Sequence, residues 1–72
     1  MYRFLVIVEQ TDSNYSAYSP DLPGCVATGA TREEAEERMH EAIELHIEGL
    51  REDELPIPPS RSSAIYVAVG RG

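Results

Sequence analysis

Apolar and polar residues in the N-terminal part of the chain occur in short runs that are typical of β-strands. Residues 2–10 (YRFLVIVEQ) are rich in β-branched and aromatic side chains, and the polar residues 11–14 (TDSN) follow them as a turn. Residues 14–19 (NYSAYS) form a second run, which the segment 20–24 (PDLPG) ends, and residues 25–29 (CVATG) form a short third run. These runs predict three strands joined as an antiparallel meander.

The period of the apolar positions changes to that of an α-helix after residue 30. Thr31 and Glu34 match a capping box, in which the Thr31 side chain accepts from the Glu34 amide and the Glu34 side chain reaches back to the Thr31 amide. The apolar face of the helix, an arc of about 140°, contains Ala35, Met39, Ala42, Ile43, His46, Ile47 and Leu50. The opposite, solvent-facing side carries Glu33, Glu37, Glu41, Glu44 and Glu48. This pattern predicts a helix from Thr31 to about Arg51, whose charge suits the negative helix C-terminus.

Gly49 lies inside this helix, on the flank of the apolar arc, where glycine costs about 0.5–1 kcal/mol relative to alanine. Two interpretations are open: another segment approaches closely at this position, or Gly49 weakens the last turn of the helix. The second is favoured because isolated glycines are tolerated in helices.

The remainder of the chain contains a connector and one more apolar run. Residues 52–62 (EDELPIPPSRS) contain three prolines, which end the helix and favour an extended, semi-rigid form. A proline-rich ligand for an aromatic groove is the weaker alternative. Residues 64–69 (AIYVAV) predict a last strand. The order is therefore β-β-β-α-β, an α+β fold with one helix packed on one face of the sheet, as a single domain over residues 1–72.

The predicted sheet has more apolar surface than one helix can cover. In the first strand Tyr2, Phe4, Val6 and Val8 alternate with Leu5 and Ile7, so both faces of the strand are apolar. A chain of 72 residues buries only about 60% of its unfolded surface, and a single cysteine, Cys25, allows no internal disulfide. We therefore expect a homodimer, formed through the sheet surface or by strand exchange.

The charge of the chain is strongly acidic. Thirteen acidic residues oppose six arginines, lysine is missing, and the net charge is −7 with neutral histidines. Nucleic-acid affinity depends mostly on basic side chains that neutralise phosphates, so direct nucleic-acid binding is not expected, and a basic protein is the simplest partner. The short apolar run at residues 4–8 is neither a signal peptide nor a membrane span, which predicts a cytoplasmic protein without membrane association.

Candidate catalytic and metal-binding residues have simpler structural interpretations. Cys25 as a nucleophile with His40 or His46 as its base lacks a recognisable motif, and Cys25 is better explained as a small buried apolar residue. Asp21, Glu9 and the helix carboxylates are poorly placed for a metal, and the helix acids are better explained as a solvated face. No glycine-rich phosphate loop is present. We therefore predict no catalytic, cofactor-binding or metal-binding residues and no enzyme activity.

Three segments of the sequence resemble the HicB-like antitoxin family: residues 15–25 (YSAYSPDLPGC), residues 27–31 (ATGAT) and residues 33–35 (EEA). The resemblance continues through the helix to Leu50 and into residues 55–60 (LPIPPS), so that it covers nearly the whole chain. It implies a degenerate RNase H-like half-fold without the nuclease carboxylates, in which the fourth strand lies beside the first in the order 3-2-1-4.

The resemblance also implies a function. Such an antitoxin neutralises HicA, a small basic mRNA-cleaving toxin, by occluding its active surface. We expect the partner contact on the free sheet face or near the loop formed by Asp21, Leu22, Pro23, Gly24 and Cys25. Many HicB antitoxins carry a C-terminal DNA-binding domain, whereas this sequence ends at Gly72, so a stand-alone HicB-like domain is expected. The alternatives are a solitary homo-oligomeric structural or regulatory protein without a toxin and, on fold analogy alone, a residual RNase H-like nuclease.

Overall fold

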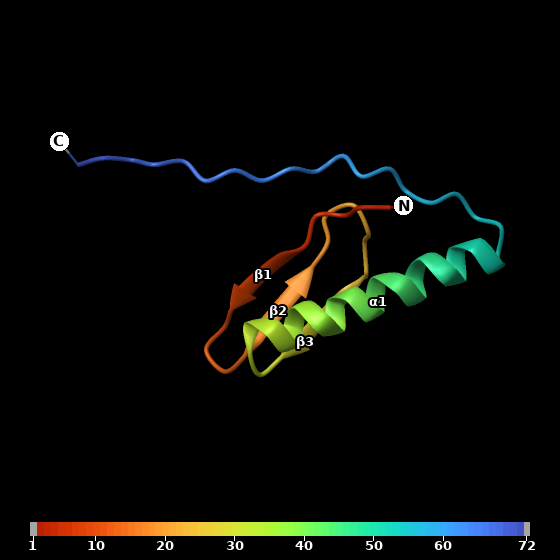
Figure 1. Cartoon of the computed structure of the whole chain (residues 1–72), viewed down its shortest axis with the longest axis horizontal. Helices are drawn as coiled ribbons and strands as arrows, with labels where there is room; N and C mark the ends of the chain where they lie inside the picture. Colours follow the sequence, from red (N-terminus) through yellow and green to blue (C-terminus); the bar gives the residue numbers. More distant parts are fainter. Residues whose placement is uncertain (1, 72) are drawn as a thin grey trace.

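The computed structural model describes residues 2–71 as a three-stranded antiparallel sheet followed by one helix (Figure 1). Strands β1 (Ile7–Gln10), β2 (Tyr15–Tyr18) and β3 (Val26–Gly29) lie in the order β1-β2-β3, and helix α1 (Arg32–Glu52) comes after them. This confirms the α+β class, the meander and the single helix. The strands are shorter than predicted, most clearly the first, because residues 2–6 precede the paired region.

The register of the sheet separates its two faces. Val8 lies opposite Ala17, which lies opposite Ala27 on β3. The neighbouring row, on the other face, is Ile7, Tyr18 and Val26. Because successive side chains of a strand point to opposite faces, the first row joins the core beneath the helix and the second row faces away from it.

The core lies between the helix and one face of the sheet. Helix α1 contacts all three strands, most extensively β3 and least extensively β1. The buried apolar side chains are Ala17, Leu22, Cys25, Ala35, Met39 and Ile47. The last three come from the predicted apolar arc, whose other members are partly buried, while the glutamates predicted for the solvent-facing side are exposed.

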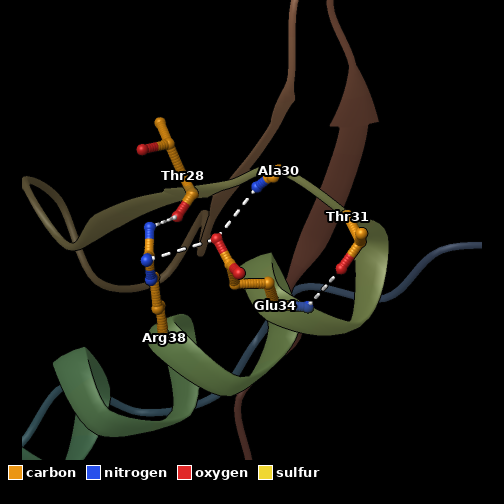
Figure 2. Close-up of polar contacts among 5 residues, drawn as sticks. All are labelled: Thr28, Ala30, Thr31, Glu34 and Arg38. Atoms are coloured by element: carbon orange, nitrogen blue, oxygen red, sulfur yellow. Dashed lines mark hydrogen bonds and ion pairs between the residues drawn. The ribbon is translucent and has the colours of Figure 1, made fainter.

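The start of α1 is capped much as predicted, with one difference (Figure 2). The Thr31 hydroxyl accepts a hydrogen bond from the Glu34 amide at 3.1 Å. The Glu34 carboxylate, however, accepts from the Ala30 amide at 3.0 Å, so the prediction that it bonds to the Thr31 amide was wrong by one residue. Arg38 then joins the helix to β3, because its guanidinium donates to the Thr28 carbonyl at 3.1 Å and pairs with Glu34 at 3.2 Å.

Close packing of the helix against the sheet occurs at Gly29, not at Gly49. A Cβ atom at Gly29 would lie 2.5 Å from the Ala35 nitrogen and 2.9 Å from the Glu34 carbonyl carbon, so only glycine allows α1 to pass this closely over β3. A Cβ atom at Gly49 would meet nothing within 4 Å. No described segment of this chain therefore approaches Gly49 closely, and the weakening of the last turn stays a prediction.

The strand predicted at residues 64–69 is not formed. After the helix the chain runs in an extended conformation, first past residues 2–6 and then away from the body of the protein (Figure 1). The radius of gyration is 14.5 Å, whereas a compact chain of this length would have about 11 Å. A strand requires a hydrogen-bonded neighbour, and residues 63–71, the C-terminal tail, have none among the described residues. The order 3-2-1 is thus observed without the fourth strand.

Candidate protein-binding surfaces

The loop between β2 and β3, residues 19–25 (the Asp21 loop), is built from two successive tight turns. The Leu22 amide donates to the Ser19 carbonyl at 3.1 Å, and the Cys25 amide donates to the Leu22 carbonyl at 3.1 Å. Gly24 has a φ of +83°, a backbone conformation that favours glycine. These turns direct the side chains of Leu22 and Cys25 into the core, where both are buried.

Asp21 fastens the C-terminal part of the chain to this loop. One carboxylate oxygen accepts from the Arg61 amide at 3.0 Å and the Ser62 amide at 2.9 Å, and the other accepts from the Ser62 hydroxyl at 3.0 Å. The Ser62 amide is the main cause of a lowered pKa of the Asp21 carboxyl, which partial desolvation opposes and the Ser62 hydroxyl and Arg61 reinforce. The sequence placed Asp21 in a turn and suggested it as a partner contact, but it contained no signal for its hydrogen-bond partners, which lie 40 and 41 positions away.

The five residues predicted to contact a partner lie together in this loop, but their environments differ. The side chains of Leu22 and Cys25 belong to the core, and Asp21 is occupied by the C-terminal segment. Pro23 and Gly24 are exposed. A partner contact of the loop stays a prediction, and its accessible part consists of Pro23 and Gly24.

The face of the sheet opposite the helix carries an apolar row, the open face, which consists of Ile7, Tyr18 and Val26. Tyr18, the last residue of β2, and Val26, the first residue of the edge strand β3, are 37% and 65% exposed, although both are large apolar or aromatic residues. Val26 follows directly on the Asp21 loop, so the open face is continuous with the exposed Pro23 and Gly24. Apolar surface of this kind on a small domain is typical of a protein contact.

A second apolar surface, the β1 groove, lies between the outer side of β1 and the helix. Its volume is about 780 Å³. The lining side chains on the sheet side are Tyr2, Phe4, Val6 and Val8, and those on the helix side are Glu36, His40, Ile43, Glu44, Ile47, Glu48 and Arg51. The Arg51 guanidinium lies 5.4 Å from the centre of the Tyr2 ring and closes one end of the groove. The sequence pattern predicted the apolar residues on both sides but contained no sign that a groove would separate them.

The residues considered for catalysis are not arranged for it. Burial raises the pKa of the Cys25 thiol, which lowers the fraction of nucleophilic thiolate. His40 is exposed and lies 3.3 Å from Glu44 on the next helical turn, and His46 is half-buried. Within residues 2–71, no group of three or more His, Cys, Asp or Glu side chains is arranged to hold a metal ion, and no helix is long and apolar enough to cross a membrane.

The small α+β fold combines an apolar row on the open face with a partly apolar groove at the β1 edge. These are features of a protein-binding module. The family model described as the HicB-like antitoxin of bacterial toxin-antitoxin systems matches residues 4–69, and the chain belongs to this family. Membership of this family supports a role in a toxin-antitoxin system.

Several curated proteins are similar to the chain. A UPF0150 protein of Synechocystis is 42% identical over 59 residues, which cover 81% of this chain and 75% of that protein. A UPF0150 protein of Helicobacter pylori is 39% identical over 59 residues, or 82% of each chain. A 14.9 kDa protein from the rep-hol intergenic region of Haemophilus phage HP1 is 37% identical over 62 residues, which cover 86% of this chain but 47% of the phage protein. No solved structure matches the chain.

Proposed function

We propose that this chain is a homodimeric antitoxin that binds and neutralises a small basic mRNA-cleaving toxin of the HicA type in the cytoplasm, without catalysis of its own. The observation that carries the proposal is the match of residues 4–69 to the HicB-like antitoxin family. The lowered thiolate fraction of Cys25 and the engagement of both Asp21 oxygens by Arg61 and Ser62 support a non-catalytic role.

The toxin contact is the open face together with the exposed part of the Asp21 loop. The exposed Tyr18 and Val26 supply apolar contact area, which gives most of the affinity at the centre of a protein interface. The net charge of −7 attracts a basic protein and repels nucleic acid, so it favours the toxin over the RNA that the toxin cleaves.

The test is to produce this chain together with a small basic protein encoded beside it. The two proteins are expected to co-purify in a fixed ratio, and the purified chain is expected to suppress mRNA cleavage by the basic protein. Val26→Arg is expected to weaken the complex at least about tenfold, because it places a positive charge against a basic partner and removes apolar contact.

Leu45→Arg is the matched control. Leu45 is 69% exposed, close to the 65% of Val26, but it lies on the helix. Equal loss of binding in the two variants would contradict the assignment of the open face. A chain that forms dimers but neither binds nor inhibits any basic neighbour would refute the antitoxin and favour a solitary homo-oligomer.

A further inference from the structure

The C-terminal tail carries an apolar run whose side chains are not buried against the described residues of its own chain. Ile65, Val67 and Val69 are 83%, 71% and 84% exposed, and Tyr66 is fully exposed. Their spacing is that of a strand, with Ile65, Val67 and Val69 on one face and Tyr66 on the other. Exposed apolar β-type sequence is a strong candidate for pairing with a free sheet edge.

The β1 edge of the sheet is free, and the β1 groove lies beside it. Among the described residues β1 pairs only with β2, so the outer N–H and C=O groups of β1 are open. The β1 groove runs along this edge, with Phe4, Val6 and Val8 on one wall. On the other wall Ile43 and Ile47 are the apolar side chains among charged and polar ones. A strand added beside β1 would direct alternate side chains into this groove.

The path of the chain directs the tail away from its own β1. Tyr18 lies opposite Ile7, so the Asp21 loop that follows β2 is located at the start of β1. Asp21 holds Ser62 at this place, and residues 57–62 already run beside residues 2–6. The part of the sheet next to Ser62 is the start of β1, a strand of four residues. The tail does not run beside β1 but leaves the body of the protein (Figure 1).

We propose that the C-terminal tail of one copy pairs as a strand with the β1 edge of a second copy and places Ile65, Val67 and Val69 in its β1 groove. The exchange is reciprocal, so that each copy donates one tail and receives one, in a closed two-fold dimer. Tyr66 then extends the row Ile7, Tyr18 and Val26 on the open face. The tail from Ser62 to Val69 reaches about 25 Å when extended, which is comparable to the 27 Å width of the molecule.

This inference rests on the proposed homodimer and specifies how the dimer is held together. It can be tested by paramagnetic NMR on the protein alone. A Cys25→Ala, Ala68→Cys chain at natural isotope abundance carries a nitroxide label on its new thiol and is refolded with an equal amount of ¹⁵N-labelled wild-type chain. Ala68 lies on the same face of the tail as Tyr66, so the label does not enter the groove. The expected result is broadening of the ¹⁵N amide signals of residues 7–10.

The control places the nitroxide on a Cys25→Ala, Glu41→Cys chain. Glu41 is exposed on the solvent-facing side of α1, and this label is expected to leave the signals of residues 7–10 sharp. Broadening only when label and isotope are on the same chain would show that the tail closes on its own β1, and no broadening in either arrangement would show a free tail. Either result overturns the proposal.

A proline substitution tests the same inference through the mass in solution. Val67→Pro removes an amide that a strand needs and is expected to weaken dimerisation about 100-fold, whereas Gly70→Pro, beyond the apolar run, leaves it unchanged. Neither position belongs to the sheet or the helix, and circular dichroism verifies that both variants fold. A dimeric Val67→Pro variant would contradict strand exchange. Because no toxin is present, these results are independent of toxin binding by the open face.

Discussion

Asp21 and Ser62, which are 41 positions apart, are joined by two hydrogen bonds, in which the Ser62 amide and hydroxyl donate to the Asp21 carboxylate at 2.9 and 3.0 Å. This contact fixes the point at which the connector ends and the C-terminal tail leaves the body. It therefore links the loop between β2 and β3 to the segment that we propose to be exchanged between two copies.

Loss of the Asp21 carboxylate is expected to release the connector without unfolding the sheet. In Asp21→Ala the Arg61 and Ser62 amides lose their acceptor and should exchange with solvent faster, while the amides of β2 keep their protection. Hydrogen exchange followed by NMR measures this difference. Asp12→Ala, in the exposed turn between β1 and β2, is the control and should change neither set. Unchanged exchange at Ser62 in Asp21→Ala would contradict the anchor.

The anchor should also depend on pH. The pKa of Asp21 is lowered in the folded chain, so the ionised carboxylate stabilises the folded state above the unfolded pKa, which is about 3.9, and this contribution is lost as the pH falls through the lower folded pKa. An NMR titration of the Ser62 amide is expected to show a midpoint below about 3.9. Asp21→Asn should abolish this transition. A midpoint above the ordinary value would contradict the assignment.

Gly29 and Gly49 should respond to alanine with opposite signs. Gly29→Ala forces a Cβ atom against the backbone of α1 and is expected to lower the free energy of unfolding by about 1–3 kcal/mol. Gly49→Ala meets no neighbour and is expected to raise it by about 0.5–1 kcal/mol, since alanine favours the helix. Denaturant unfolding of the two variants measures both effects. A shift of the same sign in both would contradict the packing at Gly29.

Ser19 should be replaceable with a gain in stability. Its hydroxyl is buried, with 3% of the residue exposed, and has no hydrogen-bond partner among the described residues. Ser19→Ala removes an unpaired buried polar group and is expected to raise the free energy of unfolding by about 1 kcal/mol. The exposed Ser63 provides the control, since Ser63→Ala should be neutral. Thermal unfolding measures the effect, and a loss of stability in Ser19→Ala would mean that the hydroxyl has a partner.

The local pattern of the sequence predicted every element whose partners are near in the chain. The polar turn before Asn14 and the segment from Pro20 to Gly24 separate strands that pair with their sequence neighbours, so the order 3-2-1 was predictable. The Thr31 cap and the apolar arc gave the helix to within one residue at each end. These features depend on interactions over a few residues, which a sequence displays directly.

The tertiary structure decided the features that depend on distant contacts. Residues 64–69 have the composition of a strand, but pairing requires a backbone neighbour, and beyond the anchor at Ser62 the tail diverges from its own β1 (Figure 1). Likewise Gly29, and not Gly49, is the site of close packing, because the path of α1 across β3 determines which glycine meets a backbone. The Asp21 loop also depends on tertiary structure, because its turns bury Leu22 and Cys25 and leave Pro23 and Gly24 exposed. Composition determines what a segment can form, whereas long-range contacts determine which neighbour it meets.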